Sequence, residues 1–173
     1  GRIVKVTDPN GSDLEYNYSP VGDLKSVVAQ GVTVIELEYD DLGRKTKMID
    51  ANMGEWSYEH YDSGLIHKQT DAKGQVTEHI YDSFNRLIEK YYYLADGSLE
   101  KSEIYTYDSG DASHNVVLGE LFKVDEFDSD GNLLRSTKFG YDSLFRRQEV
   151  ITKSIPEYAD FEQSFEYDVR GAV

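Results

Sequence analysis

The sequence contains no cysteine, which excludes disulfide bonds and thiolate metal sites. Proline is also scarce, at 3 of 173 residues. No apolar run approaches the roughly 20 residues that a membrane-spanning helix needs, and the opening segment Gly1–Lys5 does not have the pattern of a signal peptide. We therefore expect no membrane insertion, and we expect any targeting signal to lie outside this chain.

Positively charged residues are too few to balance the acidic ones. The chain has 18 Lys and Arg residues against 33 Asp and Glu residues, which gives a formal net charge of −15. Such a chain repels the phosphates of nucleic acids and anionic lipids, so neither is an expected partner. A basic partner or bound cations stay open, but solvated surface carboxylate explains the acidity more simply.

Motifs of known chemistry are missing as well. The sequence has no His-Glu-x-x-His zinc motif, phosphate-binding loop, dinucleotide fingerprint or Gly-x-Ser-x-Gly elbow. Asp128–Asn132 resembles a calcium loop only superficially, because Phe139 stands where an EF-hand requires Glu. The histidines are scattered, at His60, His67, His79 and His114. We therefore predict no catalytic residue, no cofactor and no metal site, and a protein that is not an enzyme.

What the sequence does contain is a short internal repeat. Its signature is a tyrosine followed by an aspartate, at Tyr39-Asp40, Tyr61-Asp62, Tyr81-Asp82, Tyr107-Asp108, Tyr141-Asp142 and Tyr167-Asp168. Tyr18-Ser19 and Phe127-Asp128 look like relaxed versions of this pair. From Tyr18 the first intervals are 21, 22 and 20 residues, and later intervals are less regular. A period of this length indicates one supersecondary unit per repeat.

Each Tyr-Asp pair is followed by residues that favour a turn. Asp40 can accept hydrogen bonds from backbone amides two or three residues on, and Gly43 can adopt a positive φ. Asn85 replaces the glycine in a later repeat and also tolerates the left-handed region. Arg44 and Arg86 follow these turns, and we expect each to pair with a repeat aspartate or to lie over a tyrosine ring.

A second class of turn lies between the Tyr-Asp turns. It appears at Asp8–Gly11, Asp71–Gly74 and Asp128–Gly131. The segments between turns run about six to ten residues and are rich in Val, Ile, Thr and Tyr, which is typical of strands. We expect about fourteen strands, and short turns should make consecutive strands antiparallel neighbours. The predicted fold class is therefore all-β, built from antiparallel β-hairpin repeats.

Aromatic residues offer the best candidates for ligand contact. Alternation places Tyr16 with Tyr18, and Tyr105 with Tyr107, on one face of their strands, so stacked repeats should align them as an aromatic ladder. The rings that could stack on a sugar are Trp56, Tyr58, Tyr91, Tyr92 and Tyr93. We favour packing between strands as their role over ligand contact. A single sheet buries one face at best, so we expect partial closure, edge-mediated association or contact with neighbours.

The order Tyr-Asp-x-x-Gly-Arg, strand, Asp-x-x-Gly, strand, Tyr-Asp resembles the YD repeats of the rearrangement-hotspot (RHS) family. The same repeats occur in Tc toxin components and in teneurins. Residues 39–81 carry the resemblance best, and residues 110–121 and 154–160 depart from it as worn or inserted stretches. We interpret residues 1–173 as a single YD-repeat segment of a longer protein.

The resemblance implies a curved, spiralling sheet that forms part of a hollow shell. In bacterial members this shell encloses a C-terminal toxin or effector, so the implied partners are the remainder of the same shell and an enclosed toxin domain. The implied location is secreted or at the bacterial cell surface. The alternative is an extracellular adhesion module that binds glycans or a cell-surface protein through its aromatic surface. No catalytic residue carries over, because the matched Tyr, Asp, Gly and Arg positions belong to the scaffold.

Overall fold

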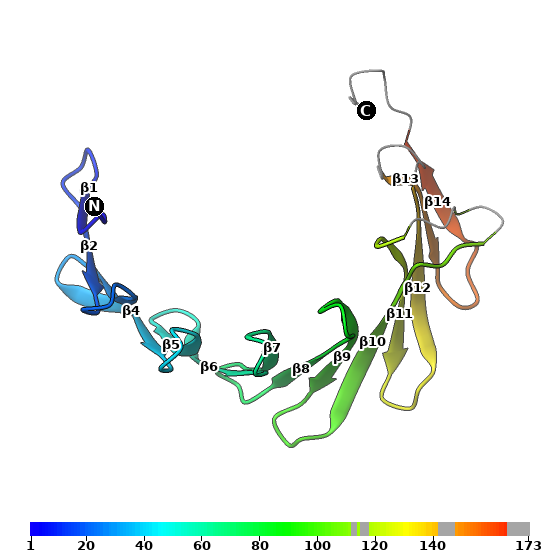
Figure 1. The fold of residues 1–173 in the computed structure, drawn as a ribbon, viewed down its shortest axis with the longest axis horizontal. Coiled ribbons are helices and arrows are strands. Elements are labelled where there is room, and N and C mark those ends of the chain that lie inside the picture. Colours follow the sequence, from blue (N-terminus) through cyan, green and yellow to red (C-terminus); the bar gives the residue numbers. More distant parts are fainter. Residues whose placement is uncertain (112–113, 115–117, 142–147, 166–173) are drawn as a thin grey trace. The chain divides into compact units, whose positions relative to one another are not determined.

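A computed structural model describes residues 1–111, 114, 118–141 and 148–165 of the chain. These residues form fourteen β-strands and no helix, and the strand order in the sheet follows the sequence from β1 to β14 (Figure 1). Every strand pairing for which a register is defined is antiparallel. The prediction of an all-β fold with about fourteen antiparallel strands is confirmed.

The chain divides into two compact units. The first contains residues 1–78 and the turn at 94–97, and the second contains residues 79–93 and 98–173. The strands that begin in the first unit are β1 (Lys5–Thr7), β2 (Asp13–Tyr18), β3 (Leu24–Ala29), β4 (Val32–Tyr39), β5 (Lys45–Asp50), β6 (Gly54–His60), β7 (Ile66–Thr70) and β8 (Val76–Tyr81). The second unit holds β9 (Leu87–Tyr93), β10 (Leu99–Tyr107), β11 (Leu121–Asp128), β12 (Leu133–Tyr141), β13 (Gln148–Ser154) and β14 (Phe161–Ser164).

Turns alternate between the two ends of the strands, because each strand reverses into the next. Within each unit, the connections from even to odd strands carry the Tyr-Asp pairs, and we call this the Tyr-Asp end. Most connections from odd to even strands carry the second turn class, and we call this the Asp-Gly end. The β3–β4 connection (residues 30–31) and the β13–β14 connection (residues 155–160) do not have this pattern. The described Tyr-Asp pairs therefore lie beside chain reversals, as the sequence predicts.

Phe127-Asp128 is the exception to the predicted repeat. This pair ends β11, and its turn joins β11 to β12 at the Asp-Gly end. Interpreting it as a relaxed Tyr-Asp pair was wrong, because Asp128 begins the second class of turn. The next described tyrosine of the Tyr-Asp end is Tyr141, and the connection at 108–120 before it is longer than the others at that end.

In the strand registers defined for the described residues, no aromatic residue lies directly opposite another on the adjacent strand. Tyr18 lies opposite Leu24, and Tyr39 lies opposite Lys45, after a local register shift in each case. Tyrosines of successive Tyr-Asp turns are two strands apart, or about 9.5 Å, because each repeat contributes two strands. The side chain of the intervening strand therefore separates the rings.

Few side chains are buried in the described part of the chain. Val27 and Phe122 are the buried apolar residues, at 7% and 8% exposure, and the buried polar residues are His114, Ser136 and Thr152. The sheet is therefore stabilised by backbone hydrogen bonds, turns and cross-strand side-chain pairs more than by an apolar core. The expected contacts with a partner or a second copy stay a prediction.

Candidate functional site

Five turns share one pattern of hydrogen bonds, and they occur at both ends of the strands. Asp40 Oδ1 accepts the amides of Leu42 and Arg44 at 3.0 and 2.9 Å. Asp71, in the second turn class, accepts the amides two and four residues on at 2.8 and 2.9 Å. The same bonds form at Asp8, Asp82 and Asp128. The predicted role of aspartate is confirmed at these five turns, although the second amide lies four residues on. Asp108 differs, because its Oδ1 accepts the Gly119 amide eleven residues on.

The residue at the third position after the aspartate has a positive φ. Gly43 has φ 76° and Gly74 has φ 80°. Asn85 holds the same place with φ 63°, as its left-handed tolerance predicts. The amide of Gly43 donates to the Asp40 carbonyl at 3.0 Å, which closes a type I turn followed by a left-handed residue. Aspartate and glycine are therefore sufficient to close either class of turn.

Arginine and tyrosine side chains do not close the turns. Instead, they join one Tyr-Asp turn to the next. In the first unit, Arg44 Nε pairs with Asp40 Oδ2 at 2.7 Å within its own turn. Its Nη1 donates to the Tyr61 carbonyl at 2.9 Å in the following turn. In addition, the Tyr18 hydroxyl donates to the Ile3 carbonyl at 2.9 Å, which links the Tyr18 turn to the preceding repeat instead of the following one.

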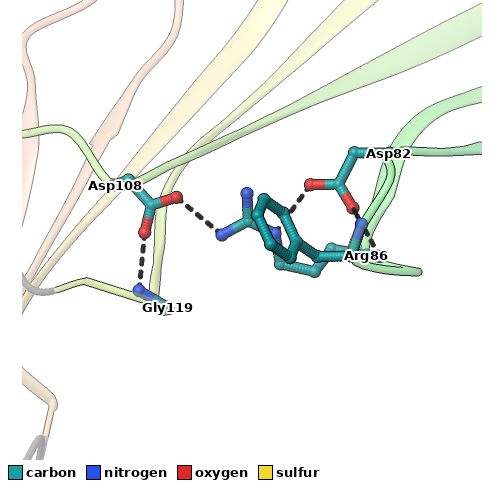
Figure 2. A network of polar contacts seen from close by, with 5 residues as sticks. Asp82, Arg86, Asp108 and Gly119 are labelled. Carbon is teal, nitrogen blue, oxygen red and sulfur yellow. Dashed lines mark hydrogen bonds and ion pairs between the residues drawn. The ribbon is translucent and has the colours of Figure 1, made fainter.

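The second unit repeats this link with more contacts. Figure 2 shows Arg86 between two carboxylates, with Nε 2.7 Å from Asp82 Oδ2 and Nη1 2.7 Å from Asp108 Oδ2. The guanidinium carbon also lies 4.5 Å from the centroid of the Tyr107 ring. Asp108 Oδ1 in turn accepts the Gly119 amide at 2.5 Å, which ties the long 108–120 connection to the same network. Arg86 thus makes both kinds of contact predicted for the repeat arginines.

Three successive turns at the Asp-Gly end are joined by close packing of small residues, whereas a Cβ on Gly11, Gly97 or Gly131 at the same end would meet nothing within 4 Å. A Cβ placed on Gly54 would lie 2.6 Å from the Cβ of Ala72, one turn further along that end. A Cβ placed on Gly74 would lie 3.5 Å from the Cβ of Ala95 in the turn after that. At the Tyr-Asp end, a Cβ on Gly43 would meet nothing within 4 Å. Some successive turns at the Asp-Gly end therefore contact each other directly. At the Tyr-Asp end, Arg44 and Arg86 join their own turns to the next ones.

The turn carboxylates are held in their ionised form. The backbone amide of Arg44, and then its guanidinium, lower the pKa of Asp40. The Gly119 amide and then Arg86 lower the pKa of Asp108. At the opposite end, the Asn132 side chain and amide lower the pKa of Asp128. Fixed N–H donors stabilise a carboxylate but not its protonated form. These turns should therefore be more stable at neutral pH than in acid.

The candidate aromatic residues of the first unit make contacts within the sheet. Trp56 Nε1 donates to the Met53 carbonyl at 3.3 Å, and Trp56 lies opposite Met48. The Lys45 ammonium lies 4.1 Å from the centroid of the Tyr58 ring. Both aromatic side chains are half-buried and share a face of β6. Their predicted role in ligand contact stays a prediction.

The three consecutive tyrosines of β9 lie on two faces. Tyr91 and Tyr93 share one face with ring centroids 6.4 Å apart, and Tyr92 points to the other. The Tyr92 hydroxyl donates to Glu103 Oε1 at 2.9 Å, and the ammonium groups of Lys90 and Lys101 lie 4.8 and 4.5 Å from its ring centroid. These tyrosines therefore do not form one continuous aromatic surface.

Glu103 is the centre of a small polar cluster around Tyr92. Its second carboxylate oxygen accepts the Tyr105 hydroxyl at 2.5 Å. Burial, together with these hydrogen bonds to Glu103, raises the pKa of both Tyr92 and Tyr105. The cluster joins β9 to β10 and is a structural cross-strand pair.

One long-range network in the second unit has no counterpart in the sequence patterns. Asp111 Oδ1 lies 2.7 Å from His114 Nδ1, and His114 Nε2 lies 2.9 Å from Thr152 Oγ1 on β13. Asp111 Oδ2 also pairs with the Lys138 ammonium at 2.7 Å. The order resembles a nucleophilic relay, but His114 and Thr152 are only 4% and 9% exposed, which leaves little room for a substrate. We interpret the network as a tie between the 108–120 connection and the sheet.

Several predicted positions cannot be placed. Asp142, Tyr167 and Asp168 lie outside the described residues. In the part of the chain that the structure describes, no cluster of three or more His, Asp or Glu side chains is suited to a metal ion. The same part offers no helix with the length and apolar character needed to cross a bilayer.

Comparison with solved structures shows which fold this is. The chain is similar to part of the Tc holotoxin pore structure of Photorhabdus luminescens, with a TM-score of 0.57 and 16% identity over 95% of this chain. The chain has an RHS/YD-shell-like fold. It spans only 9% of that larger chain. The prediction from the Tyr-Asp repeats is therefore confirmed at the level of the fold.

Two further structures are similar at lower TM-scores. One is TcdB2-TccC3 without its hypervariable C-terminal region, with a TM-score of 0.46, 12% identity, and coverage of 99% of this chain and 12% of that chain. The other is a porin-like protein from Bacteroides uniformis, with a TM-score of 0.46, 13% identity, and coverage of 95% and 58%. No family model matches the sequence. No curated protein matches it either.

Proposed function

We propose that this chain is a non-catalytic wall segment of an RHS/YD-repeat shell. The shell encloses or presents a C-terminal toxin or effector in a secreted or surface-exposed bacterial protein. The observation that carries the proposal is the Arg86 network, in which one side chain joins two successive turns through Asp82 and Asp108. A wall needs such links between neighbouring hairpins, whereas an isolated hairpin does not.

The distribution of buried residues supports a wall over a free-standing domain. Val27 and Phe122 are the buried apolar side chains of the described residues. A single sheet gains further burial only when another layer or another part of the protein covers it. The proposed partners are therefore the remainder of the same shell, which would continue the sheet beyond β1 and β14, and an enclosed toxin domain.

Protease protection in the full-length parent protein tests this function. The C-terminal domain should resist digestion while the shell is intact. Replacing Arg44 and Arg86 by alanine should loosen the wall and expose that domain at a protease concentration that spares the wild type. Gln75→Ala is the matched control, since Gln75 follows the turn glycine at the Asp-Gly end and should leave protection unchanged. Equal digestion of wild type and arginine variant would count against an enclosing wall.

The alternative function is an adhesion module that binds glycans or a cell-surface protein. The contacts around Tyr92 favour the wall, because its hydroxyl is bonded to Glu103 and two lysines lie near its ring. A glycan array decides between the two. Specific binding that Trp56→Ala or Tyr92→Ala removes would support the adhesion module.

A further inference from the structure

The residue that follows the turn glycine at the Tyr-Asp end alternates along the chain. Arginine holds this place at Arg2, Arg44 and Arg86, but Asp23 and Leu65 hold the two places between them. Each arginine extends over the next turn of the same end. The Arg2 guanidinium lies 5.6 Å from the centroid of the Tyr18 ring, and Arg44 and Arg86 make the bonds described above.

A groove lies where aspartate replaces the arginine. Its volume is about 730 Å³, and it separates the turn that contains Asp23 from the turn that follows it. Tyr39 and Gly43 line the groove. They correspond to Tyr18 and Gly22 in the preceding repeat, where the Arg2 guanidinium is so close to Gly22 that a Cβ there would collide with it. The groove is therefore the place that an arginine occupies one repeat earlier.

The charge of the groove matches the missing group. Asp23, Glu38 and Asp41 contribute carboxylates, and Lys25 contributes one ammonium group. Asp40 lines the groove as well, but its carboxylate is already paired with Arg44. Burial, and then the charge of Asp23, raise the pKa of Tyr39, which is consistent with a carboxylate near the phenol ring. The groove thus combines an aromatic ring with an excess of negative charge, as the Arg86 network does.

We propose that this groove binds the guanidinium group of an arginine from a basic segment of a partner protein. The in-chain arginines specify the ligand, since acidity alone would fit any cation. A planar guanidinium donates to carboxylate and carbonyl oxygens while it stacks on a ring, which an ammonium group does less well. The Arg86 side chain already does this with Asp108 and Tyr107 in the same protein. The proposal concerns this groove alone and holds whether or not the parent protein encloses a toxin.

Small arginine probes test the groove directly. The probes are the Nα-acetyl amides of arginine, lysine and citrulline. Each is titrated into the isotope-labelled chain, and the backbone amide signals of residues 39–43 are followed by NMR. The arginine probe should bind saturably, the lysine probe more weakly, and the neutral citrulline probe should not bind. Citrulline shifts equal to the arginine shifts would overturn the proposal.

Three variants locate the binding. Asp23→Arg should abolish it, because the new side chain occupies the groove from within the chain. Leu65→Arg makes the same kind of change at the next equivalent place and should leave the affinity unchanged. Asp23→Asn should weaken binding about two- to five-fold, the range of a partly exposed ion pair. Undiminished binding to a folded Asp23→Arg variant would overturn the proposal, and if that variant does not fold, undiminished binding to Asp23→Asn would do so.

Discussion

Successive turns are connected by different residues at the two ends of the strands. At the Asp-Gly end, Gly54 and Ala72 lie so close that one extra methyl group would collide. At the Tyr-Asp end, Gly43 has open space around it, and Arg44 crosses to the next turn. Aspartate and glycine close the turn at both ends, so the comparison separates turn closure from the connection between turns.

This difference accounts for the arginines Arg44 and Arg86 at the Tyr-Asp end. A direct contact between small residues needs no long side chain. An open gap between turns needs a side chain that reaches across it and finds partners on both sides. Arg86 meets that need through Asp82 and Asp108. The repeat pattern therefore encodes two kinds of connection as well as the hairpin.

Acid should have the largest effect, because it weakens both ends together. The turn carboxylates have a folded-state pKa below the usual range, including Asp40 and Asp128. A lowered pKa contributes stability that is complete above the unfolded pKa and lost as pH falls through the folded pKa. Circular dichroism should show a folded sheet at pH 5 to 7 and cooperative loss below about pH 4. An unchanged sheet signal at pH 2 would contradict this account.

Gly54→Ala should be the most damaging single substitution. The new Cβ would combine a positive φ of 77° with a 2.6 Å approach to Ala72. We expect a loss of about 2–4 kcal/mol in urea unfolding, from backbone strain and overpacking together. Gly43→Ala is the matched control, with the same backbone strain and no collision, and should lose about 1–2 kcal/mol. Adding Ala72→Gly should recover part of the Gly54→Ala loss, and no recovery would contradict direct packing.

Arg86→Ala should weaken the opposite end. It removes charged hydrogen bonds to Asp82 and Asp108 and the contact with the Tyr107 ring. We expect Tm to fall by about 4–6 °C in a calorimetric scan, and Gln75→Ala to change Tm by less than about 1 °C. Equal effects of the two variants would remove the distinction between the ends.

Substitutions of Asn85 should have the smallest effect on stability. They separate the closure of a turn from the connection between turns. Its φ of 63° suits glycine better than alanine. Asn85→Ala should lower the free energy of unfolding by about 1 kcal/mol, and Asn85→Gly should change it by less than about 0.5 kcal/mol. A larger loss in the glycine variant would show that the Asn85 side chain itself holds the turn.

Sequence alone predicts the features that depend on local chemistry. The hairpins, their antiparallel order and the positive φ of Asn85 follow from residues within one turn. The sequence assigned Phe127-Asp128 to the wrong end of the strands. The pair resembles the Tyr-Asp dipeptide, but its place in the strand order puts it at the Asp-Gly end. The strand count, rather than the dipeptide, decides which end a turn occupies.

Contacts across repeats were harder to predict. The sequence suggested that Arg86 meets an aspartate or a ring, but it did not identify Asp108 as the partner. The approach of Gly54 to Ala72 depends on the spacing of two turns, which no local pattern specifies. The link from His114 to Thr152 joins residues 38 positions apart and has no sequence signal.

A double-mutant cycle on Arg86 and Asp108 tests the central claim most directly. Arg86→Ala, Asp108→Asn and the combined variant are compared with the wild type by urea unfolding. If Arg86 connects two turns, Asp108→Asn should cost clearly less stability when Arg86 is already absent. Strictly additive effects would mean that the turns are not joined through this pair, and would contradict the account.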